Sequence, residues 1–158
     1  MQITQIQDTA LKLYLGIHIN ESEADVNDLL FGKILTLAAD TIPDFKMCNE
    51  RLLDRNRDKY HITIFNAAEC AKTPILLQNV TGLLVKNSSI TYKGLGSLEQ
   101  DGMITYYVVV DSPVLNALRS DANLLPKDFH ITIGFTHKDL FKGRKNEPNV
   151  LQFNPSII

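Results

Sequence analysis

Apolar and polar residues alternate along three stretches of the chain, residues 12–19, 60–66 and 128–136. Successive side chains of a strand point to opposite faces, so each stretch is predicted to be a strand with one apolar face. Two more stretches, residues 89–98 and 103–111, flank an Asp-Gly dipeptide and predict a β-hairpin. The two glycines of the Gly-Leu-Gly run in the first hairpin strand predict a bulge or bend.

Helical spacing follows the first predicted strand. Ser22 and Asp25 have the spacing of a capping box, and a helix is expected to run from there to about Asp40. Its apolar residues recur at helical intervals, and Pro43 marks its end. The polar stretch 49–59 is interpreted as a loop or a short solvated helix. A basic residue in it, among Arg51, Arg55, Arg57 and Lys59, is a candidate contact for a nucleotide phosphate.

Two further helices are predicted after the second strand. Thr73-Pro74 has the composition of an N-cap and first turn. The buried side of that helix is expected to consist of Ile75, Leu76, Val80, Leu83 and Leu84. Ser112-Pro113 repeats the pattern and opens a third helix that ends before Pro126. The tail, residues 150–158, is expected to form an edge strand.

The predicted elements occur in the same order twice. A strand, a capped helix and a second alternating strand appear in each half of the chain. This order predicts an α+β fold with two pseudo-symmetric lobes of antiparallel sheet, helices outside, and one strand of each lobe facing a central cleft. At 158 residues, the chain is expected to form a single domain, residues 1–158.

The sequence His-Ile-Thr-Ile occurs twice, at His61 to Ile64 and at His130 to Ile133. In a strand, His61 and Thr63 share one face, and His130 and Thr132 do the same in the second copy. Cleavage of a phosphodiester without a metal needs a base and an acid on opposite sides of phosphorus, and two imidazoles can fill these roles. Hydroxyl groups two residues on would donate to the non-bridging oxygens.

The two H-x-T-x motifs resemble the signature of the 2H (two-histidine) phosphoesterase superfamily, which includes RNA 2′,3′-cyclic phosphodiesterases and 2′-5′ RNA ligase-like proteins. The resemblance implies an α+β fold with one motif per lobe and a phosphodiesterase that needs no metal or other cofactor. It implies substrates such as a 2′,3′-cyclic phosphate RNA end or a small cyclic or 2′-5′-linked nucleotide. It also favours His130 as the base and His61 as the acid, roles that the sequence itself does not distinguish.

Four more residues are candidate substrate contacts. Tyr14 and His18 share the polar face of the first strand; Tyr14 would stack on a base and His18 would touch phosphate. Lys138 and Lys142, in a basic segment that also holds Arg144 and Lys145, would attract an anionic substrate. The alternatives are a solvent-facing strand edge and a flexible basic loop.

Charge and composition limit the classes of partner that the chain is expected to bind. The net charge of −2 argues against duplex DNA, since such binding depends on many Lys and Arg contacts to phosphates. Neither a signal-peptide pattern nor a run of 18 apolar residues is found, and the two cysteines lack metal-ligand spacing. We therefore expect a cytoplasmic monomer with no membrane association and an RNA end or small nucleotide as its substrate.

Three alternatives to the phosphodiesterase remain open at this stage. The first is a catalytically silent protein that binds a nucleotide or RNA end in the same cleft. The second is a metal hydrolase that uses His18, His61, His130 and an acidic residue, although no H-E-x-x-H or C-x-x-C motif is present. The third is a structural domain whose two motif histidines lie far apart.

Overall fold

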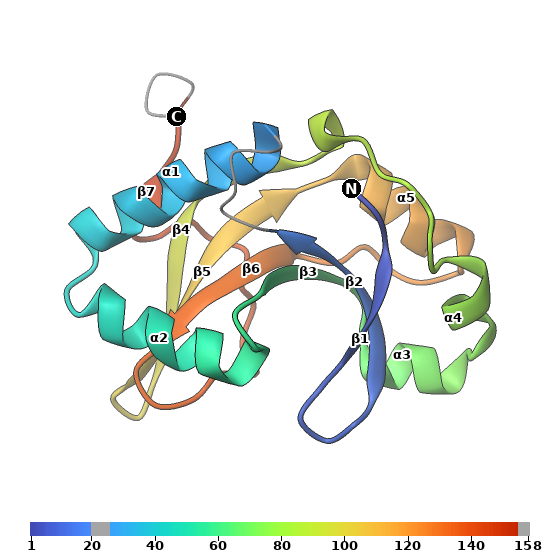
Figure 1. Ribbon diagram of the computed structural model, residues 1–158, viewed down its shortest axis with the longest axis horizontal. Helices are drawn as coiled ribbons and strands as arrows, with labels where there is room; N and C mark the ends of the chain where they lie inside the picture. Colours follow the sequence, from blue (N-terminus) through green and yellow to red (C-terminus); the bar gives the residue numbers. More distant parts are fainter. Residues whose placement is uncertain (20–25, 155–158) are drawn as a thin grey trace.

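The computed structural model describes residues 1–19 and 26–154, which form two antiparallel sheets (Figure 1). The first sheet has the order β1-β2-β3 and contains β1 (Thr4–Gln7), β2 (Leu13–Ile19) and β3 (Tyr60–Phe65). The second has the order β6-β5-β4-β7 and contains β4 (Thr91–Gln100), β5 (Met103–Asp111), β6 (Phe129–Phe135) and β7 (Leu151–Gln152). The predicted α+β architecture with two lobes is confirmed.

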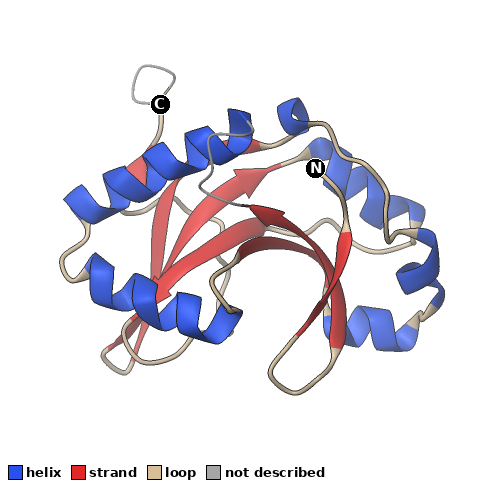
Figure 2. Cartoon of the chain, viewed as in Figure 1, coloured by secondary structure: helices blue, strands red, loops and turns tan. Residues whose placement is uncertain are grey.

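Helices lie outside the curved strands, as Figure 2 shows. They are α1 (Val26–Thr41), α2 (Phe45–Asn56), α3 (Ala67–Lys72), α4 (Ile75–Asn79), α5 (Pro113–Asp121) and a short 3-10 turn, η1 (Asn87–Ser89). Helices α1 and α2 connect β2 to β3, and α5 connects β5 to β6. Each motif strand therefore follows a strand and a helical segment, in the order that the sequence predicted. In the described part of the chain, no helix is both long and apolar enough to span a membrane.

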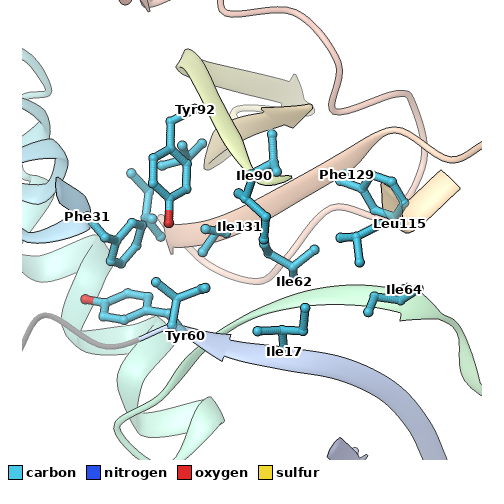
Figure 3. Close-up of a cluster of buried hydrophobic side chains, with 14 of the residues drawn as sticks. Ile17, Phe31, Tyr60, Ile62, Ile64, Ile90, Tyr92, Leu115, Phe129 and Ile131 are labelled. Carbon is cyan, nitrogen blue, oxygen red and sulfur yellow. The ribbon is translucent and has the colours of Figure 1, made fainter. Parts of the chain in front are cut away.

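The apolar faces of the two motif strands form the centre of the hydrophobic core (Figure 3). Ile62 and Ile64 of β3 and Ile131 and Ile133 of β6 are all fully buried. Around them pack apolar side chains from both sheets and the helices, including Ile17, Phe31, Ile90, Leu115 and Phe129. Burial of four branched side chains, each contributing on the order of 1.5–3 kcal/mol, fixes which face of each strand points away from the core.

The hairpin and its following helix form as predicted. Asp101 and Gly102 both have positive φ, 54° and 76°, as a two-residue turn with the twist of the flanking strands requires. The pairing of β4 with β5 shifts register between Tyr92 and Gly94, which confirms the bulge. Ser112 accepts a hydrogen bond from the Leu115 amide at 3.2 Å and Pro113 begins α5, so the predicted cap is present.

Several elements differ from prediction. The stretch expected as a loop or short helix from residue 49 belongs to α2, which begins at Phe45 and buries Phe45, Cys48 and Leu52. The intervals of three and four residues between these side chains are a helical signal. A boundary placed at Asn49, where the polar stretch begins, separates Phe45 and Cys48 from Leu52 and hides that signal. Strand β1 and helix α3 were also missed, although α3 starts with a capping box between Asn66 and Glu69.

The second predicted helix is shorter than expected. Helix α4 ends at Asn79, and Leu83 and Leu84 are 41% and 82% exposed, so the expected burial of both leucines is wrong. Pro74 takes the N-cap position without a side-chain hydrogen bond, so the predicted cap at Thr73 is also wrong. Within the tail, Leu151–Gln152 form the edge strand β7 next to β4, and residues 155–158 of the predicted strand lie outside the described residues. The predicted Ser22–Asp25 capping box lies outside the described residues.

Candidate functional site

The two motif strands contribute their polar faces to one cavity of about 760 Å³. His61 and Thr63 of β3 and His130 and Thr132 of β6 all line it, while the isoleucines between them are buried in the core. Strands β3 and β6 belong to different sheets but pack against each other. The two copies of the motif, 69 residues apart, therefore meet as predicted.

Helix α2 holds the two motif strands together. The side-chain amide of Asn49 donates to the Tyr60 hydroxyl at 2.7 Å and to the Ile133 carbonyl at 2.8 Å. The helix lies so close to β6 that a Cβ at Gly134 would be 2.9 Å from the Cys48 carbonyl carbon. Asn49 thus bridges β3 and β6, and Gly134 permits this approach.

A buried arginine fixes the other end of β3. Arg119 of α5 donates to the Ile64 carbonyl at 2.7 Å and forms a two-pronged ion pair with Glu69 of α3, at 2.9 and 2.8 Å. It also donates to the Leu125 carbonyl at 2.8 Å, in the loop before β6. Because a guanidinium offers several donors in a rigid plane, one side chain fixes β3, α3 and the loop before β6 relative to one another.

Both motif histidines are neutral at physiological pH. Burial, the charge of Arg55 and the nearby His18 and His130 lower the pKa of His61 to about 4. Burial and the charges of Lys145 and Lys127 lower the pKa of His130 to about 4, against the hydrogen bond with Asp128. Neutral imidazoles beside cations suit a site that receives an anion.

The hydrogen bond of His130 identifies its proton-accepting nitrogen. Nδ1 of His130 lies 3.2 Å from the backbone carbonyl oxygen of Asp128. Because a carbonyl oxygen only accepts, Nδ1 carries the ring proton and Nε2 of the neutral ring has a free lone pair. The ring is thus in the tautomer that a base requires.

His61 has a different partner on its neighbouring strand. The Tyr14 hydroxyl lies 3.2 Å from His61 Nε2, and the two rings are tilted at 53°. Burial raises the pKa of Tyr14 to about 12, so the phenol keeps its proton. Gly16 follows Tyr14 on the same face of β2, and a Cβ there would lie 2.4 Å from the Ile62 carbonyl oxygen. Tyr14 lines the cavity but points its polar end at the motif histidine.

His18 is a third polar ring in the cavity wall formed by β2 and β3, in addition to Tyr14 and His61. It pairs directly with His61 across β2 and β3 and lines the cavity. Burial and the charge of Lys59 lower its pKa, against a hydrogen bond with the Tyr60 backbone. Within residues 1–19 and 26–154, no hydrogen-bond partner of the buried His18 Nδ1 is found.

A buried carboxylate joins one cation from each side of the cavity. Asp139 accepts from Lys145 Nζ at 2.7 Å and from Arg55 at 3.0 Å. Asp139 and Lys145 side chains are each 6% exposed, and all three residues line the cavity. Although burial favours the neutral acid, Lys145 and Arg55 keep the pKa of Asp139 lowered. This triad, Arg55–Asp139–Lys145, has a net charge of +1 in the cavity wall.

The two lysines predicted to contact the substrate do not line the cavity. Lys138 and Lys142 are exposed and are not among the residues that line it. The same segment instead contributes Arg144 and Lys145, and α2 and the residues after it contribute Arg55, Arg57 and Lys59. The sequence located the basic segments, but charge density alone did not indicate which side chains face inward.

One aromatic residue was overlooked. Phe141 lines the cavity although it is 82% exposed, and Lys145 Nζ lies 5.7 Å from its ring centroid. Two other aromatic residues of the motif strands and their neighbours, Phe65 and Tyr107, are buried in the protein. In the sequence, nothing distinguishes Phe141 from the other residues of the basic segment.

Among the described residues, no group of three or more His, Cys, Asp or Glu side chains is arranged to hold a metal ion. Asp139 acts on the motif histidines through its charge, which raises the pKa of both His61 and His130. The cavity wall combines the motif imidazoles and hydroxyls with Arg55, Lys145 and the carboxylate of Asp139.

Comparison with known proteins agrees with this arrangement. The family described as Swiss Army Knife, 2H phosphoesterase domain, matches residues 33–141, which include both motifs, Arg55 and Asp139. Tyr14, His18, Arg144 and Lys145 lie outside the matched range. No curated protein and no solved structure gives a significant match. On the family match, which covers well over half of the sequence, the chain belongs to the 2H phosphoesterases.

Proposed function

We propose that this 2H phosphoesterase is a metal-independent phosphodiesterase that hydrolyses a 2′,3′-cyclic phosphate RNA end or a small cyclic or 2′-5′-linked nucleotide. The supporting observation is that the polar faces of both His-x-Thr strands line one cavity. A phosphorus atom placed between the strands would have one imidazole on each side, the arrangement required for in-line displacement.

The hydrogen bond from His130 Nδ1 to the Asp128 carbonyl supports the role of base for His130. Its Nε2 accepts a proton from water while the water oxygen forms a bond to phosphorus. The bond from phosphorus to the leaving ribose oxygen breaks, and His61 gives that oxygen a proton. His130 takes up one proton and His61 releases one, so the step is balanced. At its end His130 is charged and His61 is neutral.

Hydroxyl groups and cations would hold the non-bridging oxygens. Thr63 and Thr132 lie two residues from the histidines on the same strand faces, where they can donate to these oxygens. The Arg55–Asp139–Lys145 triad adds a net charge of +1. A phosphodiester carries a single negative charge, so the triad and the substrate match in magnitude.

The acid role of His61 requires a proton that the protein alone does not retain at neutral pH, because its pKa is about 4. A phosphodiester anion beside the ring favours the imidazolium and raises this pKa. Substrate binding would thereby charge the acid. Asp139 supports the same change, since its carboxylate stabilises positive charge on either ring.

A nucleotide is favoured over other phosphodiesters by Phe141. Its ring is exposed and lines the cavity beside the triad. Stacking of a base on an aromatic ring contributes about 1–3 kcal/mol and tolerates any base. Tyr14 is less suited to stacking, because its hydroxyl is engaged with His61.

The test is hydrolysis of cyclic nucleotides, RNA ends with a cyclic phosphate and 2′-5′ dinucleotides in the presence of a chelator. His61→Ala and His130→Ala should each lower kcat at least about 100-fold, as expected for loss of a general acid or base. His137→Ala is the matched control, since this exposed histidine does not line the cavity. Binding of these ligands by the wild-type protein without any product would instead favour a silent binding protein.

A further inference from the structure

A second cavity, of about 390 Å³, adjoins the first. The two share Lys127, Asp128 and Arg144 in their walls, so these residues separate the phosphate site from a neighbouring space, here called the side cavity. Its remaining walls come from β4, the end of β5, α5, the loop before β6, the start of β6 and the segment before β7: Lys93, Val109, Val110, Asp111, Asn116, Pro126, Phe129 and Asn146.

The side cavity has more positive than negative charge. Lys93, Lys127 and Arg144 face Asp111 and Asp128, a net charge of +1 on a chain whose net charge is −2. The carboxylate of Asp128 is already paired with Arg144, at 2.7 and 2.9 Å. This leaves Lys93 and Lys127 facing a single further acid, Asp111.

Two cations, Lys127 and Arg144, line both cavities, and of these Arg144 is already paired with Asp128. The Lys127 side chain is half-buried, and burial and the charge of Arg119 lower its pKa. Among the described residues, no ion pair to its ammonium group is found. A partly desolvated cation without a paired carboxylate gains most from an anionic ligand.

Lys93 reaches the side cavity because of the bulge in β4. Pairing with β5 passes from Tyr92 to Gly94 and leaves Lys93 without a partner. Its carbonyl accepts from the Phe153 amide at 3.0 Å, which fixes the bulged backbone from the other side. Bulges of this kind re-aim a side chain, and Lys93 is exposed but still lines the side cavity.

We propose that the side cavity binds the phosphate adjoining the reacting one, so that the preferred substrate is the end of a single-stranded oligonucleotide and not a free cyclic mononucleotide. This inference rests on the proposed phosphodiesterase activity. Lys127 would contact both phosphates from the shared wall, and Lys93 would contact only the adjoining one. The side cavity would thereby favour longer substrates, while the reaction takes place in the first cavity.

The experiment compares kcat/KM for a 2′,3′-cyclic mononucleotide with that for a trinucleotide ending in the same cyclic phosphate. The wild-type protein should prefer the trinucleotide by about tenfold or more. Lys93→Ala should remove most of this preference through a higher KM, with kcat/KM for the mononucleotide within twofold of wild type. The dependence of log kcat/KM for the trinucleotide on log salt should become shallower by about 0.7, as for one lost phosphate contact with a single strand.

Lys86→Ala is the matched control, because Lys86 is an exposed lysine shortly before β4 and lines neither cavity. It should retain the preference of the wild-type protein. Equal kcat/KM for the two substrates, or a preference that Lys93→Ala leaves intact, would overturn the inference while the proposed activity stands. Failure to hydrolyse either substrate would overturn the proposed activity itself.

Discussion

Tyr14 Oη lies 3.2 Å from His61 Nε2, so this motif imidazole has a phenol from the neighbouring strand as its partner. The phenol can donate to the neutral ring or accept from the charged one, since its pKa of about 12 keeps it protonated in both cases. Tyr14 therefore orients His61 whatever the charge of the imidazole.

Removing this hydroxyl should slow turnover without unfolding the protein. Tyr14→Phe deletes one hydrogen bond, about 0.5–1.5 kcal/mol, and should lower kcat roughly three- to tenfold. The pH at which the His61 acid loses its proton in the enzyme–substrate complex should also move, as read from the alkaline limb of kcat against pH. Tyr106→Phe serves as the control, since this half-buried tyrosine does not line the cavity. An unchanged kcat and pH profile for Tyr14→Phe would mean that the hydroxyl does not orient His61.

Asp139 is expected to be the most sensitive charged position. Asp139→Asn leaves Lys145, with a side chain 6% exposed, without its carboxylate, and loss of one member of a buried pair costs about 3–5 kcal/mol. Urea unfolding should show this as a lower midpoint. Asp128→Asn should lose less, because its partner Arg144 is open to solvent. Equal stabilities of the two variants would contradict a structural role for the triad.

Acid should destabilise the protein through the motif histidines. Their pKa values are about 4 in the folded protein and about 6.5 when unfolded. Because the folded pKa is the lower one, the unfolded chain binds protons first as the pH falls. The stabilisation is complete above pH 6.5 and is lost toward pH 4. Between pH 7 and 5, each histidine should account for about 1–2 kcal/mol of lost unfolding free energy.

Replacing a motif histidine should make that pH dependence shallower. His61→Asn and His130→Asn should lose less unfolding free energy between pH 7 and 5 than the wild-type protein, and the double variant least of all. Urea titrations at each pH give these values directly. Variants whose stability declines as steeply as that of the wild-type protein would show that the imidazoles are not held neutral by their surroundings.

Phe141 should affect affinity for the base and leave stability intact. Phe141→Ala removes a ring that is 82% exposed and should raise KM for a cyclic nucleotide about 5- to 160-fold, as expected for loss of about 1–3 kcal/mol of stacking. KM for ribose 2′,3′-cyclic phosphate, which lacks a base, should change little. Leu125→Ala is the matched control, because Leu125 is equally exposed and does not line the cavity. The same effect on both substrates would argue against stacking.

The repeated His-Ile-Thr-Ile run determined, without any knowledge of tertiary structure, which side chains face the core and which face the cavity. In a strand this depends only on alternation, which is a local property of the chain. The same holds for the hairpin at Asp101-Gly102 and the cap at Ser112. The errors also concern local signals. The start of α2 was placed at Asn49 because the polar side of the helix is long, and α3 was not predicted although its capping box is present in the sequence.

Which cations face the cavity was decided only by packing. Arg55 comes from α2 and Lys145 from the segment after β6, and they meet because Asp139 lies between them. The sequence favoured Lys138 and Lys142 from the same basic segment, and nothing in their spacing separates them from Arg144 and Lys145. Whether a charged side chain points into a cavity depends on contacts between segments distant in the chain, and the pKa values of His61 and His130 depend on the same contacts.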